Sequence, residues 1–342
     1  MRMTISDIAK LANVSKSAVS IVLNNKTGVS EKTRAKVLET IKKYNYNPNQ
    51  LAQSLASKET KSIGLIIKEI DNPYFSKVMK GVFDACSELG YSVLVGTSEL
   101  STDKESEIVN TLLSKRVDGI IISPLKSGEL DLSYFSNLFN ENIPWVVLGK
   151  TSILGNYVDI DNIKAAYDAV TYLINLGHRE IAHIAGPSYS GHGLKRLEGY
   201  KQALSDNNIP INSDLIIPVD PYTANGYLAG KELLSLKDQN PTAVFCYNDL
   251  VAIGLINSLT ENNIKVPDDI SIIGFDNIDF SEYLKIPLTT VHMPAYEIGK
   301  AAAVLLIKQL SSGSVPLNES VVLEHKIIER NSCSALQDVI KK

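Results

Sequence analysis

The sequence predicts a short all-α head followed by an α/β body made of two doubly wound, parallel-sheet lobes. Over residues 1 to 46, apolar residues recur at helical spacing between residues that are typical of helix caps. From residue 62 onward, short β-branched runs alternate with amphipathic stretches, which is the pattern of parallel strands joined by helices. With 342 residues, the chain is long enough for two or three compact units.

Composition and cysteine usage narrow the class of protein. Hydrophobic residues make up 44% of the chain, which is enough for real cores and argues against disorder. The three cysteines are odd in number and far apart, so they indicate a reducing compartment and neither a disulfide framework nor a zinc site. The first residues have no apolar signal core, and no apolar run approaches transmembrane length. We therefore expect a cytoplasmic protein with no membrane partner.

Charge is distributed unevenly along the chain. Residues 1 to 61 contain 11 Lys or Arg residues and 4 acidic residues, so this segment carries +7. The remaining residues hold 23 bases and 34 acids, which gives −11. A basic head on an acidic body suggests that the head binds a polyanion, although a lysine-rich surface can also be merely solvated.

Cap residues and apolar spacing predict three helices in the head. Thr4 and Asp7 form a capping-box pattern that opens the first helix. Ser15 is expected to cap the second helix after a tight turn, and Ser30 to cap the third. The inward-facing positions are expected to be Ile5, Ile8, Ala9 and Ala12 in the first helix, and Val37, Leu38 and Ile41 in the third. Two short helices joined by a tight turn are a helix-turn-helix, whose second helix enters the DNA major groove.

The second helix, "SKSAVSIVLN" over residues 15 to 24, has an unusual polar side. Its apolar stripe is Ala18, Val19, Val22 and Leu23, whereas Ser15, Ser17 and Ser20 carry short hydroxyl side chains. Short side chains let the backbone approach phosphates and base edges, and Lys16 adds positive charge. A helix-turn-helix can also be plain structural packing, but the charge of the head favours nucleic acid.

Several ordered motifs resemble one known family. These are "TISDIAKLANVSKSAVSIVLN" and "VSEKTRAKVLETIKKYNYNPNQLAQSLAS" in the head, and "SIGLIIKEIDNPYFSKVMKGV", "GHREIAHIAGP", "RLEGYKQAL", "PTAVFCYNDLVAIG" and "VPDDISIIGFDN" in the body. They are similar to the LacI/GalR family of bacterial transcription regulators, and the resemblance covers essentially the whole chain. It implies a body like that of the periplasmic binding proteins, a homodimer, and an approximately palindromic double-stranded DNA operator.

The resemblance assigns DNA contacts to the head. The recognition helix is residues 15 to 23, and residues 48 to 56 are a hinge helix with Leu55 as a wedge for the minor groove. The DNA-binding residues that we expect are Thr4, Ser15, Lys16, Ser17, Ser20, Ile21, Asn24, Leu51, Ala52 and Leu55. The family commonly has Thr-Val-Ser-Arg where this chain has Ala18-Val19-Ser20-Ile21. Because Ile cannot donate a hydrogen bond to guanine, the operator is expected to differ from the common half-site.

The resemblance also sets the expected domain boundaries. The helix-turn-helix domain is residues 1 to 46, the hinge helix and linker are 47 to 60, the two-lobe body is 61 to 333, and the tail is 334 to 342. In the family the chain crosses between the lobes three times. Lobe one is then about 61 to 161 and 293 to 320, and lobe two is about 162 to 292 and 321 to 333, with a final strand near 321 to 329 in lobe two.

The carboxyl ends of the predicted strands indicate a ligand cleft between the lobes. Carboxylates, amides, an arginine and aromatic rings occur there, a mixture that suits a polyhydroxylated ligand such as a sugar. The effector-binding candidates are Asp71, Tyr74, Phe75, Ser190, His192, Arg196, Tyr222, Asn248 and Asp276. Asn248 and Asp249 are as readily explained as helix caps. Arg196, Lys195 and His192 could instead hold a phosphate, so a sugar phosphate is an alternative ligand.

The sequence gives little sign of catalysis or of a cofactor. The "HREIAH" stretch, residues 178 to 183, is not a zinc-protease motif, and neither a P-loop nor a GxSxG motif is present. We therefore expect no enzyme but a repressor of sugar-utilisation genes, controlled by a small effector. One alternative is control by a phosphorylated carrier protein, as in the catabolite control protein, although Val304 stands at or near the position of an Arg in that relative. A two-lobe transport protein is disfavoured by the basic head.

Overall fold

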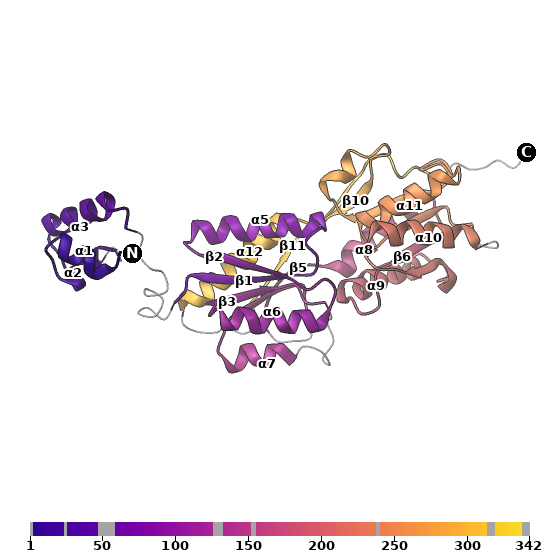
Figure 1. Cartoon of the computed structure of the whole chain (residues 1–342). Coiled ribbons are helices and arrows are strands. Elements are labelled where there is room, and N and C mark those ends of the chain that lie inside the picture. The colour runs from indigo at the N-terminus through magenta and orange to yellow at the C-terminus, as the bar shows by residue number, and fades with distance from the viewer. Residues whose placement is uncertain are drawn as a thin grey trace, which may run out of the picture. The chain divides into compact units, whose positions relative to one another are not determined.

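The computed structural model describes residues 3–23, 26–46, 59–125, 133–151, 155–236, 240–312 and 319–336 (Figure 1). The chain divides into two compact units, Met1–Lys61 and Ser62–Lys342. The expected hinge helix lies outside the described residues, and so do Asn24, Leu51, Ala52 and Leu55. None of the described helices combines the length and hydrophobicity that crossing a membrane needs.

The head contains three helices, α1 (Ile5–Leu11), α2 (Lys16–Leu23) and α3 (Glu31–Lys43). The expected caps are present: the Thr4–Asp7 capping box opens α1, and the Ser30 hydroxyl accepts a hydrogen bond from Thr33 N at the start of α3. The helices pack around a small core of Ile8, Ala9, Ala12, Val19, Val22, Val37 and Tyr46. Leu38 was expected in this core but is 51% exposed. It directly follows the buried Val37, and consecutive residues of a helix point about 100° apart, so Leu38 faces away from the core.

Lobe one is built on a parallel sheet in the order β11-β5-β4-β3-β1-β2. Helices α5 (Pro73–Glu88) and α12 (Ala295–Ser312) lie on one side of this sheet, and α6 (Thr102–Ser114) and α7 (Ser133–Asn140) lie on the other (Figure 1). The strands are β1 (Ser62–Ile67), β2 (Ser92–Thr97), β3 (Gly119–Ile122), β4 (Trp145–Leu148), β5 (Asn156–Ile160) and β11 (Ser320–Leu323). In β1, Leu65 and Ile66 point into different cores on the two faces, as a doubly wound sheet requires.

Lobe two repeats this plan with the sheet order β12-β10-β9-β8-β6-β7, in which only β12 runs antiparallel to its neighbour. Its helices are α8 (Asn162–Asn175) and α9 (Gly191–Asp206) on one face, and α10 (Thr223–Ser235) and α11 (Asp249–Glu261) on the other. The strands are β6 (Ile181–Ala185), β7 (Ile216–Pro218), β8 (Ala243–Cys246), β9 (Ser271–Asp276), β10 (Thr289–His292) and β12 (Lys326–Ile328). Short 3-10 helices, η2 (Ser213–Leu215) and η3 (Asp279–Glu282), complete the lobe.

The chain passes between the lobes after β5, before α12 and between β11 and β12. The expectation of one final strand over residues 321 to 329 in lobe two is wrong. Ser320–Leu323 pairs with β5 in lobe one, and only Lys326–Ile328 pairs with β10 in lobe two. Two short strands separated by two residues look like one β-branched run in the sequence, because hydrophobic pattern does not show which sheet a strand joins.

Candidate DNA-binding face and ligand cleft

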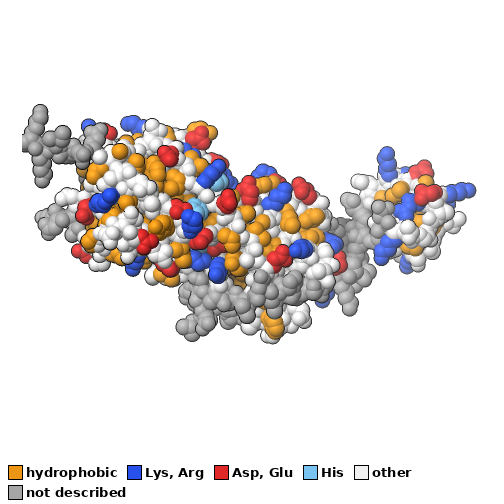
Figure 2. Space-filling view, turned by 180° about the vertical axis from the view of Figure 1, so that it is seen from behind, with side chains coloured by type: hydrophobic (Ala, Val, Ile, Leu, Met, Phe, Trp, Pro, Cys, Tyr) orange, Lys and Arg blue, Asp and Glu red, His pale blue; other side chains and the backbone are white. Residues whose placement is uncertain are grey.

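The second helix of the head presents the side chains that were expected to meet DNA. Ser15, Lys16 and Ser17 are exposed, and Ser20 is half-buried. The Ser15 hydroxyl accepts a hydrogen bond from Ala18 N at 3.1 Å, so it caps the helix. A shallow depression on this side is lined by Ile5, Lys16, Ser17, Ser20, Ile21 and Lys26. Figure 2 shows Lys and Arg side chains on the face of the head that it presents.

Two expected DNA contacts also have roles within the head. The Thr4 hydroxyl donates a hydrogen bond to Asp7 at 2.7 Å, while Thr4 itself is exposed at the start of α1. Ile21 is half-buried, and its side-chain tip lies 3.8 Å from the place where a Cβ would stand on Gly28. Ile21 therefore packs partly against the segment after α2, in addition to bordering the depression.

The body holds a cleft of about 690 Å³, its open mouth included, whose walls come from both lobes. Seven of the nine expected effector residues line it: Tyr74, Phe75, Ser190, His192, Arg196, Asn248 and Asp276. The other two do not. Asp71 is exposed outside the cleft. The Tyr222 hydroxyl instead lies at the carboxylate of Glu69 on the opposite lobe, and burial together with this hydrogen bond raises the pKa of Tyr222.

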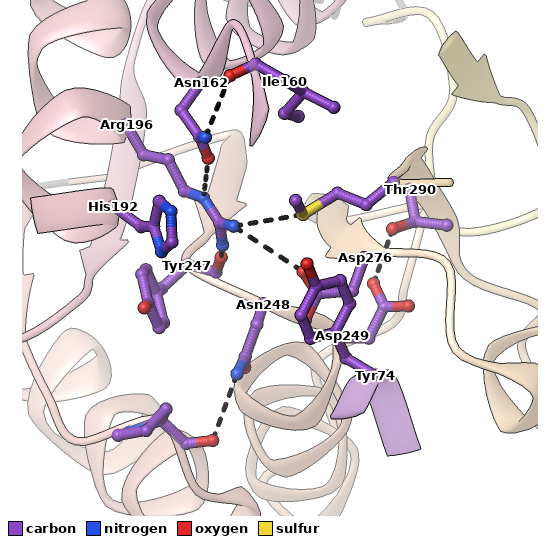
Figure 3. Close-up of polar contacts among 12 residues, drawn as sticks. Tyr74, Ile160, Asn162, His192, Arg196, Tyr247, Asn248, Asp249, Asp276 and Thr290 are labelled. Carbon is purple, nitrogen blue, oxygen red and sulfur yellow. Dashed lines mark hydrogen bonds and ion pairs between the residues drawn. The ribbon is translucent and has the colours of Figure 1, made fainter. Parts of the chain in front are cut away.

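Arg196 is the most constrained side chain of the cleft (Figure 3). Its Nε donates to Asn162 Oδ1 at 3.2 Å, its Nη1 donates to the main-chain oxygen of Tyr247, and its Nη2 lies 3.5 Å from Met293 Sδ. The guanidinium also lies 3.6 Å from the centre of the Phe275 ring. These contacts hold the planar fork in one orientation, which is what a donor to a small ligand needs.

Asp276, which ends β9, stands beside Arg196 with its carboxylate uncommitted. The Asp276 Oδ1 is 3.7 Å from Arg196 Nη2, and among the described residues this carboxylate accepts no hydrogen bond. Its backbone has a φ of 108°, in the left-handed region that a non-glycine residue rarely adopts. Burial raises the pKa of Asp276 to about 7, and Arg196 opposes this rise. A strained residue whose buried carboxylate has a long ion pair and no direct hydrogen bond among the described residues is typical of a ligand site.

Asn248 and Asp249 are both engaged in structural hydrogen bonds, but the helix-cap interpretation is correct only for Asn248, because Asp249 is the first residue of α11 and bonds groups outside that helix. Asn248 Oδ1 accepts from Val251 N at 2.8 Å at the start of α11. The buried carboxylate of Asp249 accepts from the Thr290 hydroxyl at 2.6 Å and from Ile278 N at 2.9 Å. Asp249 therefore fixes the loop that follows Asp276, and burial raises its own pKa to about 8. Asn248 still borders the cleft, since its side chain lines the wall.

The structure adds lining residues that the candidate set lacked, above all Lys68, Glu69, Asp159 and Tyr247. Glu69 and Tyr247 lie just after the carboxyl ends of β1 and β8, so the position of a strand end is the signal that could have found them. Asp159 was missed because the short strand β5, "NYVDI", was not recognised. The pattern that could have predicted this strand is the pair of β-branched residues, Val158 and Ile160, on either side of Asp159, with Tyr157 before them. Lys68 directly follows β1, where an isolated lysine is usually solvated.

The two lobes are in direct contact at both sides of the cleft. Lys77 Nζ on α5 lies 2.6 Å from Asp279 Oδ1 in lobe two. Lys195 Nζ on α9 donates to the main-chain oxygen of Lys150 at 2.9 Å and lies 3.4 Å from Asp159 in lobe one. The cleft is therefore enclosed by ion pairs and hydrogen bonds that lobe separation would break.

Comparison with known proteins agrees with both parts of this architecture. Residues 4–49 match the model of the bacterial regulatory proteins, lacI family, and residues 170–333 match the periplasmic binding protein-like domain. The catabolite control protein A of Priestia megaterium is 36% identical over 335 residues, which cover 97% of this chain and 99% of that protein.

Two solved structures extend the comparison to three dimensions. The lac repressor dimer bound to operator and the anti-inducer ONPF matches with a TM-score of 0.87 and 29% identity, over 98% of this chain and 100% of that one. The complex of the transcriptional regulator CelR with cellobiose matches with a TM-score of 0.73 and 30% identity, over 97% and 100%. The chain therefore belongs to the LacI family of bacterial regulatory proteins and is a DNA-binding transcriptional regulator.

Proposed function

We propose that this regulator is a repressor of sugar-utilisation genes whose affinity for its operator is set by a small polyhydroxylated ligand, a sugar, bound between the lobes. The observation that carries the proposal is the pair of Asp276 and Arg196, in which an uncommitted buried carboxylate stands beside a fixed guanidinium on one wall of the cleft. The carboxylate accepts from ligand hydroxyls, and the guanidinium donates to them.

The opposite wall supplies an apolar surface. Tyr74 and Phe75 meet edge to face at 5.2 Å between ring centroids, and both line the cleft. An aromatic wall covers the C–H face of a sugar ring, while polar groups across the cleft bind its hydroxyls. The similarity to a regulator solved with cellobiose supports a ligand of this class.

A ligand that touches both walls would stabilise the closed arrangement of the lobes. The closed form already has the Lys77–Asp279 ion pair and the Lys195–Lys150 hydrogen bond. A ligand can shift the equilibrium only by its different affinity for the open and closed forms. Coupling of this kind would connect the cleft to operator binding through lobe geometry.

We also propose that the protein acts as a homodimer through its lobe faces. On lobe one, large apolar side chains are exposed on α5 and directly after it, on β2, and in the loop between β1 and α5: Ile70, Phe83, Leu89, Leu94 and Val95. Strand β2 is an edge strand of the sheet. Lobe two exposes Leu228, Leu234, Phe280 and Tyr283. Apolar surface beside an open sheet edge is typical of an interface, and a second copy is the occupant that an approximately palindromic operator requires.

The test begins with operator half-sites selected from a randomised library with the full-length protein. A thermal-shift screen of sugars, with planar nucleobases as a contrasting class, then identifies ligands that stabilise the fold. We expect a sugar that stabilises the protein also to change operator binding. Asp276→Asn should abolish this response, whereas the exposed Asp206→Asn on α9 should not. A stabilising nucleobase with no response to sugars would overturn the sugar assignment.

A regulator controlled by a protein partner is the second candidate, because the catabolite control protein A is 36% identical to this chain. The position at or near which that relative has an Arg is here Val304, on α12 of lobe one and 45% exposed. An apolar side chain cannot pair with a phosphorylated residue. Operator binding that depends on a phosphorylated carrier protein, and not on any sugar, would favour this candidate over the first.

A further inference from the structure

A small side pocket of about 230 Å³, its open mouth included, adjoins the ligand cleft. Its described lining residues include two lysines and a histidine and no acidic side chain: Lys68, Pro124, Leu148, Gly149, Lys150, Thr151, Gly191 and His192. Lys68 and His192 also line the main cleft, so one ligand can occupy both spaces. Burial, together with the charges of Lys68 and Arg196, holds the pKa of His192 well below its usual range, so the positive charge of the lining comes from its two lysines. A pocket with this charge favours a negatively charged group.

Lys68 is the unusual member of this lining. Its side chain is only 8% exposed, and among the described residues its Nζ forms no hydrogen bond and no ion pair. Burial lowers the pKa of Lys68 to about 8, with Glu105 the largest opposing influence. An ammonium without a direct partner is costly to bury, so a bound anion would relieve this cost.

Glu105 offers a structural explanation for Lys68, and the geometry argues against it. The Glu105 Oε1 accepts a hydrogen bond from Leu125 N at 2.7 Å, and no ion pair joins Glu105 to Lys68. Asp159, a second acidic group near Lys68, accepts from Lys150 N at 2.9 Å and from Asn162 Nδ2 at 2.9 Å. Glu69, the third, is hydrogen-bonded to the side chains of Tyr222 and Asn72. All three carboxylates thus have partners other than Lys68, which faces the cavity.

The first residues of α9 form another part of the same pocket. Gly191 and His192 are the first two residues of this 16-residue helix, and main-chain N–H groups at these positions have no acceptor within a helix. The main-chain N–H of Gly193, the third residue of the helix, donates a hydrogen bond to the Ser190 hydroxyl at 3.2 Å. Free N–H groups and the positive end of the helix dipole attract oxyanions.

We infer that the effector carries an oxyanion, a phosphate ester or a carboxylate, on its polyhydroxylated ring. The oxyanion binds between Lys68 and the start of α9, while the ring hydroxyls reach Asp276 and Arg196 in the main cleft. The inference rests on the proposed function and narrows its ligand class. Lys68 thereby becomes a specificity-determining residue that distinguishes a charged sugar from its neutral counterpart.

The test measures the affinity of the full-length protein for matched ligand pairs by calorimetry. The pairs are glucose with glucose 6-phosphate, ribose with ribose 5-phosphate, and glucose with glucuronate, and inorganic phosphate is measured alone. We expect the charged member of at least one pair to bind about tenfold tighter or more, because a charge-assisted hydrogen bond is added. Preference for a phosphate ester or for glucuronate identifies which oxyanion is recognised.

Two variants show whether Lys68 causes this preference. Lys68→Met should bring the charged and neutral members of the pair to about equal affinity, and Lys68→Arg should keep most of the difference. The control is Lys201→Met, an exposed lysine on α9, which should leave the affinities for both members of the pair unchanged. The melting temperature of Lys68→Met should be at least that of wild type, because the variant removes a buried charge that has no direct partner among the described residues.

Failure of the inference is distinguishable from failure of the proposed function. If neutral sugars bind as tightly as charged ones and Lys68→Met binds both like wild type, the oxyanion subsite is overturned. If those neutral sugars still change operator binding, and Asp276→Asn still abolishes that response, the proposed function stands. If no sugar of either kind changes operator binding, both proposals fall together.

Discussion

The Nη2 atom of Arg196 lies 3.7 Å from Oδ1 of Asp276, close enough for attraction and too far for a direct hydrogen bond. Arg196 is otherwise held by Asn162, Tyr247 and the ring of Phe275, whereas Asp276 has no other polar partner among the described residues. The two residues therefore differ in role. Arg196 is a donor whose orientation is fixed by the framework where the chain passes between the lobes, and Asp276 is an acceptor that the framework leaves available to a ligand.

Replacing Asp276 by Asn should abolish the effector response while operator binding without effector is kept. The variant preserves the shape of the side chain and loses the charged acceptor, which is worth about 1.5–3 kcal/mol when a hydrogen bond involves charge. Effector affinity measured by calorimetry should fall about tenfold or more. Arg196→Ala should also destabilise the fold, because it leaves Asn162 and the Tyr247 oxygen without their donor. A wild-type response in Asp276→Asn would show that the cleft assignment is wrong.

The stability of the body should depend on pH through Asp276. Burial raises the pKa of Asp276 to about 7, so the folded protein keeps a proton that the unfolded chain releases near pH 4. The free energy of unfolding therefore falls as the pH rises from about 4 to about 7, and this contribution is constant above that range. Asp276→Asn lacks this decline. Its unfolding midpoint relative to wild type should rise between about pH 4 and about pH 7 in thermal denaturation and level off above that range.

The same carboxylate gives the pH dependence of sugar binding. A ligand hydroxyl that donates to Asp276 favours the ionised form, so the affinity for a neutral sugar should increase as the pH rises through about 7. A charged sugar should show an added loss above about pH 8, because Lys68 deprotonates there. Calorimetric titrations across this range, on wild type and Asp276→Asn, check both directions. A flat profile for the neutral ligand would mean that Asp276 does not touch its hydroxyls.

The sequence predicted the fold class and most of the candidate site for identifiable physical reasons. Strand ends of a parallel sheet converge on one edge, so strand alternation placed Tyr74 at the edge of the first lobe and Asp276 at the edge of the second. The family resemblance was needed to bring the two edges together in one cleft and to add Arg196, which lies within α9. Side-chain availability could not be predicted in this way. Only the structure shows that Asn248 is committed to a helix cap, that Asp71 is exposed, and that Lys68 is buried with no hydrogen-bond or ion-pair partner among the residues it describes. The same limit applies to β11 and β12, whose sheets depend on pairing and not on composition.

Replacing Ile21 by Arg should shift DNA preference toward half-sites with a guanine opposite that position. An arginine can bond guanine O6 and N7 together, which is worth about 1–3 kcal/mol of discrimination. Ile21 borders the depression beside Lys16 and Ser20, so a longer side chain there has open space to occupy. Selection from a randomised half-site library, with wild type in parallel, measures the shift. An unchanged preference would mean that this position faces the segment around Gly28 instead of the bases.

Replacing Phe83 by Ser should weaken the homodimer. Phe83 lies on α5 with 43% of its surface exposed, next to the edge strand β2 with its exposed Leu94 and Val95. An aromatic side chain in the centre of an interface commonly contributes about 2 kcal/mol or more, so the dimer dissociation constant should rise by about 30-fold. Analytical ultracentrifugation over a range of protein concentrations measures it.

The matched control for this last change is Phe139→Ser. Phe139 is also an exposed phenylalanine of lobe one, 66% accessible, but it lies on α7 at the opposite face of the sheet. If the dimer uses α5 and β2, only Phe83→Ser should weaken association, and its operator binding should weaken in step because one head reads only a half-site. Equal effects of the two substitutions would point to general destabilisation. A wild type that is monomeric at micromolar concentration and still binds a full operator tightly would rule out the dimer.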